Sequence, residues 1–219
     1  GVPSVFRVDL AVPRAERVKV LEGLRRVLAL QSGGRDDTRG EGTARRTELA
    51  RNGSSRPGWT VPDLYGSRAD LYDLVYAFKD YASEAAMVEQ QLTALGIAPG
   101  STLLEGAVGT GAHAVHLAST YRYAGFDSSA EMVALARRKL PDARLFVADL
   151  RSFTVDRPVD AFLCLFSSVG YLLDARALAD CASAVAAAVR VGGAILIEPW
   201  LEPDQWEPGR PTLQTYDDP

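Results

Sequence analysis

The chain of 219 residues is 47% hydrophobic and 24% charged, a composition typical of a globular protein that buries one sizeable core. It has no apolar run of about 18 residues and no basic segment leading into an apolar stretch, so neither a membrane span nor a secretory signal is predicted, and a cytoplasmic protein is expected. The net charge of −4 is uneven, because residues 1–62 hold 12 Lys and Arg against 7 Asp and Glu. These basic residues lack interleaved aromatics, so nucleic-acid binding is not expected.

The region before residue 63 predicts two segments that stand apart from the main domain. From Arg14 to Gln31 apolar residues recur at spacings of three and four, which is typical of one amphipathic helix. Residues 32–62 are polar and Gly-rich, so they cannot bury enough apolar surface to offset the entropy of ordering them. We therefore expect a helical extension over residues 1–31, a disordered linker over 32–62 and a main domain over 63–219.

Helices and strands alternate beyond Pro62, which is the pattern of an α/β fold with a doubly wound, mostly parallel sheet. Five short, β-rich apolar runs predict buried strands at about Thr102–Ala107, Arg122–Phe126, Arg144–Ala148, Ala161–Phe166 and Ala194–Glu198. Helices are predicted at about Ser67–Leu95, His113–Ser119, Ser129–Leu140 and Arg176–Val189.

A glycine-rich turn follows the first predicted strand, in the segment LLEGAVGTGAH that runs from Leu103 to His113. Gly109 and Gly111 allow the backbone to pass close to a ligand, and the helix that begins there offers unpaired N–H donors. A dinucleotide fingerprint would place a third glycine in a GxGxxG pattern, which this turn lacks. A pyrophosphate ligand is therefore disfavoured.

Two aspartates lie at the ends of the next two predicted strands. Asp127 ends the second, where a carboxylate can accept hydrogen bonds from both hydroxyls of a ribose, and Asp149 ends the third, where it suits an adenine amino group. Either residue taken singly has the alternative role of capping the following helix. Three aligned strand ends favour a site for an adenosine-type ligand.

Five segments in this order give the chain a resemblance to a known family: LLEGAVGTGAH, GFDSSAEMVALARRKLPDA, ADLRSF, FSSVGYL and GGAILIEPW. Together with ADLYDLVYAFKDYASEAA upstream, they resemble the class I S-adenosylmethionine-dependent methyltransferases over about Tyr65 to Trp200. Within that class they resemble the desosamine-type enzymes, which N,N-dimethylate dTDP-linked deoxyaminosugars in antibiotic biosynthesis. The resemblance implies a Rossmann-like fold, S-adenosyl-L-methionine as cofactor and a nucleotide-linked aminosugar as substrate.

The same resemblance implies two sets of site residues. The cofactor-binding set is Tyr81, Ala107, Gly109, Gly111, Asp127, Met132, Asp149, Leu150 and Leu165. The substrate-binding set is Tyr72, Gly170, Tyr171, Leu172 and Trp200. Tyr171 and Tyr72 are the catalytic candidates, with Tyr171 expected to orient the amine, because a sulfonium is already activated and catalysis needs mainly alignment. Packing of a half-buried ring is the alternative role for Tyr171.

Neither the histidines nor the cysteines predict a metal site. His113 and His116 lie three residues apart on one helix but lack further ligands at metal spacing, so packing is favoured for His113, with cofactor contact as the alternative. Cys164 and Cys181 fall in apolar segments and are expected to be buried free thiols.

Two departures from the family leave the function partly open. Gly106 stands where the family has a β-branched residue and is expected to loosen the strand end. The family's C-terminal lid and further sheet strands have no counterpart before Pro219, so we expect an incomplete methyltransferase domain whose edge a partner or homo-oligomer could cover. A methyltransferase for another acceptor, or a cofactor-binding module without catalysis, are the alternatives.

Overall fold

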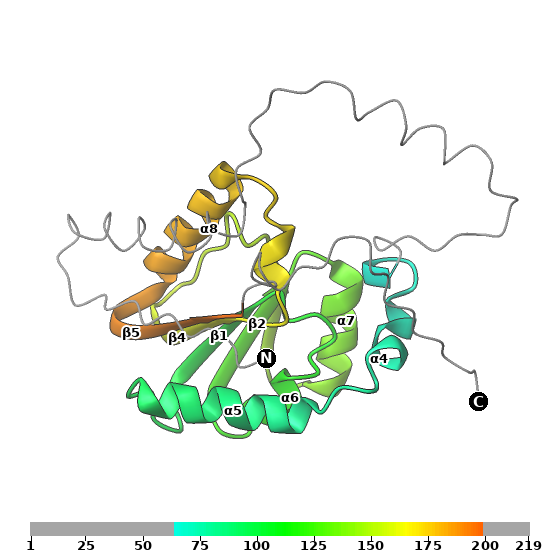
Figure 1. Cartoon of the computed structure of the whole chain (residues 1–219), viewed down its shortest axis with the longest axis horizontal. Coiled ribbons are helices and arrows are strands. Elements are labelled where there is room, and N and C mark those ends of the chain that lie inside the picture. The colour runs from blue at the N-terminus through cyan, green and yellow to red at the C-terminus, as the bar shows by residue number, and fades with distance from the viewer. Residues whose placement is uncertain (1–63, 199–219) are drawn as a thin grey trace, which may run out of the picture.

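The computed structural model describes residues 64–198, which form a five-stranded sheet with helices on both faces (Figure 1). Every pair of neighbouring strands is parallel, and the strand order is β3-β2-β1-β4-β5. The strands are β1 (Thr102–Gly106), β2 (Arg122–Asp127), β3 (Arg144–Val147), β4 (Val159–Cys164) and β5 (Val189–Ile197). The predicted doubly wound parallel sheet is confirmed. The helix predicted for residues 14–31, the linker and Trp200 lie outside the described residues.

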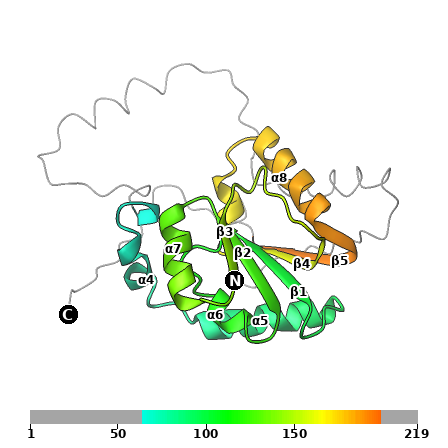
Figure 2. The same ribbon diagram turned by 180° about the vertical axis from the view of Figure 1, so that it is seen from behind.

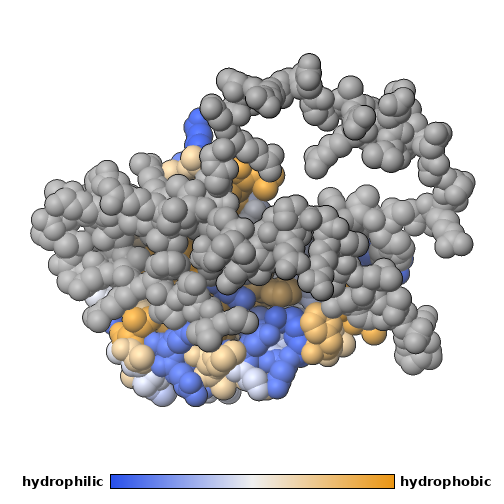
Figure 3. Space-filling view, viewed as in Figure 1, coloured by the Kyte–Doolittle hydropathy of each residue, from blue (hydrophilic) through white to orange (hydrophobic). Residues whose placement is uncertain are grey.

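The helices form one layer on each face of the sheet, as the two opposite views show (Figures 1 and 2). One layer holds α5 (Tyr81–Ala94), α6 (Ala114–Leu117) and α7 (Ala130–Lys139), and the other holds α8 (Ala175–Ala188) with the 3-10 helix η2 (Ser168–Tyr171). Over α5, at the bottom of the space-filling view, the surface mixes hydrophilic and apolar residues (Figure 3). Within residues 64–198 no helix is both long and apolar enough to span a membrane.

Two apolar cores follow from the alternation of side chains along the strands. Leu104, Phe126 and Phe162 point to the face that α8 covers, where they pack in one buried cluster. Leu103 and Leu163 point to the opposite face and pack with residues of α5, α6 and α7. Strands buried on both faces explain why the sequence shows continuous apolar runs instead of alternation.

The helix predicted over residues 67–95 is broken into three pieces, so this prediction was wrong in detail. The structure has the 3-10 helix η1 (Ala69–Leu71), α4 (Tyr72–Val75) and α5, with a turn over residues 76–80. The cause is a capping residue that apolar periodicity does not register. Asp80 Oδ1 accepts a hydrogen bond from the backbone N of Ser83 at 3.0 Å, and Oδ2 accepts from the Ser83 hydroxyl at 2.7 Å, which starts a new helix.

The ends of the last two strands also differ from the prediction. The strand β4 stops at Cys164 instead of Phe166, because Phe166 and Ser167 both adopt a left-handed backbone. The strand β5 begins at Val189, directly at the end of α8, and contains an irregularity in its pairing with β4. Cys164 and Cys181 are buried free thiols, as predicted.

Asp160 links three strands at the amino edge of the sheet. Its Oδ2 accepts from the backbone N of Thr102 at 2.8 Å and from the Thr102 hydroxyl at 2.6 Å. Its Oδ1 accepts from Arg190 Nε at 2.6 Å. Although partial burial opposes ionisation, these donors together lower the pKa of Asp160 to about 2.

Because the folded pKa lies below the unfolded value of about 3.9, the stabilisation by Asp160 is present above pH 4 and is lost as the pH falls toward 2. We therefore expect Asp160→Asn to lower the free energy of unfolding at pH 6 and to reduce its decline between pH 4 and pH 2. Urea unfolding at several pH values measures this effect. Asp156→Asn, which removes an exposed ion pair to Arg144, is the control and should cost little stability at pH 6.

Candidate functional site

The carboxyl edge of the sheet has a switch point between β1 and β4, where the chain leaves the first half of the sheet for the second. Ligands of open α/β sheets bind in the crevice at such a point. The three non-glycine residues with positive φ in the described chain, Ala107 (58°), Phe166 (52°) and Ser167 (56°), all follow β1 or β4 here. Strained backbone of this kind concentrates at binding and catalytic sites, which makes this edge the candidate site.

The turn after β1 and the end of β2 meet through Asp127. Its Oδ2 accepts from the backbone N of Gly109 at 2.9 Å, and its Oδ1 accepts from the backbone N of Ser129 at 2.9 Å. Burial raises the pKa of Asp127 despite these backbone hydrogen bonds, which lower it. A Cβ added at Gly109 would meet no atom within 4 Å, so the backbone there borders open space.

Gly111, which was predicted as a cofactor contact, packs closely against α7. It has a positive φ of 80°, and a Cβ there would lie 3.3 Å from both Ala136 Cβ and Leu140 Cδ1 of α7. The glycine therefore lets α7 pack closely against the turn. The structure provides no sign that Gly111 borders the open space beside Gly109.

A cavity of about 360 Å³ opens beside this turn, with a mixed polar and apolar lining. The predicted site residues that line it are Ala107, Asp149, Leu150, Tyr171 and Leu172. The other lining residues are Phe126, Ser128, Ala148, Arg151, Leu173, Asp174 and Ala177. The cavity thus brings together the ends of β1, β2 and β3 with η2.

The carboxylate of Asp149 is held by its neighbour Arg151. The guanidinium donates from Nε to Oδ1 at 2.8 Å and from NH2 to Oδ2 at 2.5 Å, and the Arg151 backbone N donates to Oδ1 at 2.8 Å. This pairing lowers the pKa of Asp149, so the carboxylate is ionised at the cavity wall. Sequence reasoning missed Arg151, although its position two residues after a strand-end aspartate was a usable signal.

Residues 64–80, here named the strap, lie across the carboxyl edge beside α7 and are fastened to the turn after β1 and to α7 by polar contacts, of which two involve Ser129 and Thr110. The Tyr65 carbonyl accepts from Ser129 Oγ at 2.6 Å. Asp73 of α4 accepts from the Thr110 hydroxyl at 2.5 Å and pairs with Lys139 Nζ at 2.6 Å, while Lys139 also donates to Thr110 Oγ1 at 3.2 Å. The second contact joins the strap directly to the glycine-rich turn.

The underside of the strap is an aromatic cluster that buries two predicted site residues. Tyr72 is 8% exposed and contacts the rings of Tyr65 and Tyr76, with centroid distances of 5.7 and 4.7 Å. Met132 is fully buried in the same cluster. Burial raises the pKa of Tyr72, so its phenol is neutral, and neither side chain lines the cavity.

Tyr81 lies in a second polar group at the start of α5. Its ring meets that of His113 edge-on at 4.9 Å, and burial, with the nearby charge of Glu84, raises the pKa of Tyr81 to about 12. One carboxylate oxygen of Glu84 pairs with Lys79 Nζ at 2.7 Å, and the other lies within hydrogen-bond distance of His113 Nε2, also at 2.7 Å. Burial lowers the pKa of His113, and its side chain is packed against Tyr81 and hydrogen-bonded to Glu84. No cluster of metal-ligating residues occurs within residues 64–198.

Two further predicted site residues, Leu165 and Gly170, do not line the cavity. The side chain of Leu165 is buried in the core on the α5 face, away from the cavity, whereas Gly170 is exposed at η2. Sequence reasoning also missed Glu198, whose Oε2 accepts from the backbone N of Phe166 at 2.7 Å. That bond steadies the strained segment that leads to Tyr171.

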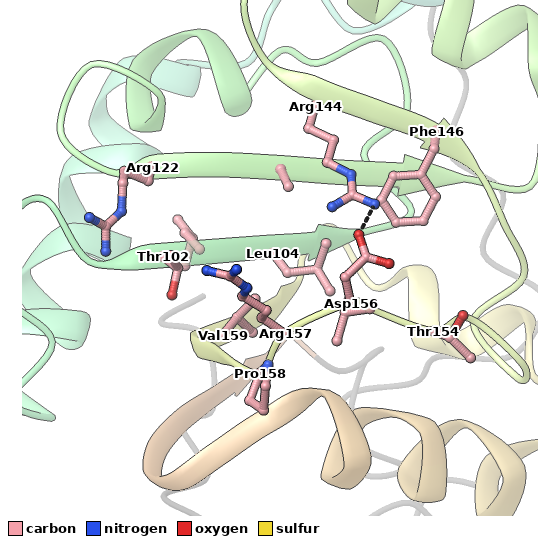
Figure 4. A pocket seen from close by; sticks show the side chains of 13 residues that line it. Thr102, Leu104, Arg122, Arg144, Phe146, Thr154, Asp156, Arg157, Pro158 and Val159 are labelled. Carbon is pink, nitrogen blue, oxygen red and sulfur yellow. Dashed lines mark ion pairs between the residues drawn. The ribbon is translucent and has the colours of Figure 1, made fainter.

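A second cavity, of about 290 Å³, lies at the opposite, amino edge of the sheet (Figure 4). Its wall includes Arg122, Arg144 and Arg157, and Arg144 pairs with Asp156 at 2.8 Å. None of the predicted site residues lines it. The predicted site residues that line a cavity are therefore those at the carboxyl edge.

Residues 103–193, which carry β1 to most of β5, match the family model for a methyltransferase domain. Over these residues the chain is therefore similar to a methyltransferase domain, and its doubly wound parallel sheet is the Rossmann-like fold that the resemblance implied. Comparison with curated proteins identifies more specific relatives. The chain is 39% identical over 159 residues to dTDP-3-amino-3,6-dideoxy-alpha-D-glucopyranose N,N-dimethyltransferase of Streptomyces fradiae, and the match covers 71% of this chain and 62% of that one. It is 38% identical over 144 residues to dTDP-3-amino-3,4,6-trideoxy-alpha-D-glucopyranose N,N-dimethyltransferase of Streptomyces venezuelae, covering 64% and 60%.

Solved structures give the same relationship. The chain matches Streptomyces venezuelae DesVI with a TM-score of 0.61 and 37% identity, covering 65% of this chain and 61% of that one. It matches the sugar N-methyltransferase KedS8 from Streptoalloteichus with a TM-score of 0.61 and 34% identity, covering 72% and 62%. The chain spans about three fifths of the length of the curated relatives it matches.

Proposed function

We propose that this chain binds S-adenosyl-L-methionine at the carboxyl edge and methylates the amino group of a dTDP-linked deoxyaminosugar in antibiotic biosynthesis. One observation carries the proposal: Asp127 is held at the end of β2 beside Gly109, whose missing Cβ leaves open space. Both oxygens of Asp127 accept backbone N–H groups, among them those of Gly109 and Ser129, and a carboxylate oxygen has room for a second donor. The names of the relatives supply the substrate class.

The residues around the cavity fit an adenosine-type cofactor. Asp127 would accept from the ribose hydroxyls, while Asp149 would share its carboxylate between Arg151 and an adenine amino group, with Leu150 beside the ring. Ala107 and Gly109 would border the cofactor through their backbone, and Tyr81 would lie toward its methionine end. When bound, the cofactor supplies an activated methyl group on a sulfonium.

The acceptor half of the site lies on η2. Tyr171 lines the cavity and is 56% exposed, so its hydroxyl can reach a ligand. Leu172 lines the same cavity, and Gly170 precedes both in the 3-10 helix. Attack requires a neutral amine with a free lone pair, so the task of these residues is to hold the amine and align it. Tyr72 is assigned to support of the strap rather than to contact with the reacting nitrogen.

Asp127→Ala tests the cofactor half of the proposal. The loss of charge-assisted acceptors in a partly desolvated site should weaken S-adenosylmethionine binding by about 1 to 3 kcal/mol, which is roughly 5- to 150-fold in Kd. Isothermal titration calorimetry measures the change. Asp142→Ala, an exposed position beyond α7, is the matched control and should bind as the parent does.

Mass spectrometry of a dTDP-aminosugar incubated with the chain and S-adenosylmethionine tests the acceptor half. A mass gain of one or two methyl groups supports the proposal.

Unchanged cofactor affinity in Asp127→Ala would refute the ribose assignment. Binding of cofactor without methyl transfer would favour a non-catalytic module, and equal transfer to the corresponding hydroxyl sugar would refute the amine assignment.

A further inference from the structure

Tyr65 and Tyr171 form a hydroxyl pair that joins the strap to the acceptor side of the cavity. Their hydroxyl oxygens are 2.7 Å apart, although the two residues are 106 positions apart in the chain. The rings meet edge-on, with a centroid distance of 5.7 Å and an interplanar angle of 82°. The distance is that of a strong O–H···O hydrogen bond.

The two partners differ in how firmly they are held. Tyr65 is partly buried, its ring packs 5.7 Å from that of Tyr72, and its carbonyl accepts from Ser129 Oγ at 2.6 Å. The backbone N of the same Ser129 donates to Asp127, so Tyr65 is tied to the cofactor half of the site. Tyr171 is more exposed, and its hydroxyl forms a hydrogen bond with the Tyr65 hydroxyl. Tyr65 is therefore the fixed member of the pair.

The chemistry of amine methylation sets a requirement on such a pair. The nitrogen lone pair must point at the methyl group, so a phenol that donates its O–H to nitrogen would block the attack, whereas a phenol oxygen that accepts an N–H leaves the lone pair free. A phenol has one donor and two acceptor positions. If Tyr171 donates to Tyr65, only acceptor positions remain on Tyr171 for the amine.

We propose that Tyr65 is a positioning residue whose hydroxyl oxygen accepts a hydrogen bond from the Tyr171 hydroxyl. The Tyr171 oxygen then faces the substrate amine purely as an acceptor. This proposal rests on the proposed function and deepens it by assigning an orientation to the amine. Burial raises the pKa of Tyr65, so Tyr65 stays neutral and serves through hydrogen bonding, not as a base. The proton released after methyl transfer leaves from the product ammonium to solvent.

Tyr65→Phe tests the proposal because it keeps the ring contacts and removes only the hydroxyl. We expect kcat on a dTDP-aminosugar to fall about tenfold, with the affinity for S-adenosylmethionine unchanged. Tyr171→Phe should fall by about tenfold to a thousandfold, and the double variant should be no worse than Tyr171→Phe, because the two hydroxyls act as a unit. Tyr121→Phe, at a buried ring outside the site, is the control and should retain the parental kcat.

A second readout does not depend on turnover. In the full chain without substrate, the 13Cζ resonance of Tyr171 should shift in Tyr65→Phe and stay in place in Tyr121→Phe. Two outcomes would overturn the proposal: additive losses of kcat in the double variant, or a Tyr171 13Cζ resonance that does not shift in Tyr65→Phe. If the parent chain does not methylate the aminosugar, the proposed function fails and the role in catalysis with it, while the resonance still decides whether the hydroxyl pair exists.

Discussion

Gly106→Val is expected to lower the free energy of unfolding by about 3 kcal/mol or more, because this strand end has no room for a side chain. A Cβ at Gly106 would lie 2.7 Å from Leu150 Cδ2, 2.9 Å from Phe126 Cζ and 3.0 Å from Phe162 Cζ. Both phenylalanines are fully buried, so they cannot move aside into solvent. Urea unfolding monitored by circular dichroism measures the loss, and Gly106→Ala should cost less, at about 1 to 3 kcal/mol.

A double variant identifies the source of this cost. Leu150 provides the closest atom, and Leu150→Ala removes it, so Gly106→Ala combined with Leu150→Ala should lose less stability than the sum of the two single variants. Additive losses would show that the clash with Leu150 is not the cause. The close packing around Gly106 also gives it a role beyond the expected loosening of the strand end. The glycine is required because Leu150, a residue at the candidate site, packs over it.

Glu105→Gln is expected to flatten the decline in stability that the parent shows between about pH 4.3 and pH 7. Glu105 is 3% exposed in β1, and burial raises its pKa to about 7, opposed by a hydrogen bond from the Tyr123 hydroxyl at 2.6 Å and aided by the charge of Asp127. A carboxyl whose folded pKa is raised stabilises the fold most when protonated. Its contribution is therefore full below the unfolded pKa of about 4.3 and is lost as the pH rises toward 7.

The size of that decline is roughly 3 to 4 kcal/mol, since each unit of pKa shift corresponds to about 1.4 kcal/mol. Glutamine keeps an acceptor for Tyr123 but does not ionise, so the difference in free energy of unfolding between parent and Glu105→Gln should change with pH across this window. Tyr123→Phe should extend the window to higher pH, because the hydrogen bond that favours the carboxylate is gone. A constant difference between parent and Glu105→Gln from pH 4 to pH 8 would contradict this account.

The fold was predictable because each strand is a short apolar run bounded by turns, and burial on both faces makes such runs easy to find. What the sequence did not reveal depended on single polar contacts. Asp80 broke the helix predicted from residue 67 by capping α5 through Ser83, and a helical period carries no information about such a bond. The early start of β5 likewise depends on its pairing with β4, a contact distant in sequence.

The candidate site was predictable where backbone geometry fixes it and less so where side chains from distant segments meet. Asp127, Asp149 and the glycine-rich turn follow directly from strand ends and positive φ, and the structure brings them to one edge. Tyr65 was not singled out, because its meaning comes from a partner 106 residues away. Met132 and Leu165 have the apolar character expected of ligand contacts, but the structure buries both in packed clusters.

The strap has a consequence for how proteins of this architecture can diversify. Under the proposed function, the cofactor contacts come mainly from the ends of β1, β2 and β3, with Tyr81 of α5 in addition, whereas the acceptor contacts come from η2 and from the strap. Changes in the strap can reshape the acceptor side without altering a residue of the glycine-rich turn, provided that the Asp73 anchor to Thr110 and Lys139 is kept. Under the proposed function, acceptor preference and cofactor affinity would therefore depend on largely separate stretches of sequence, so that selection could act on one while the other drifts little.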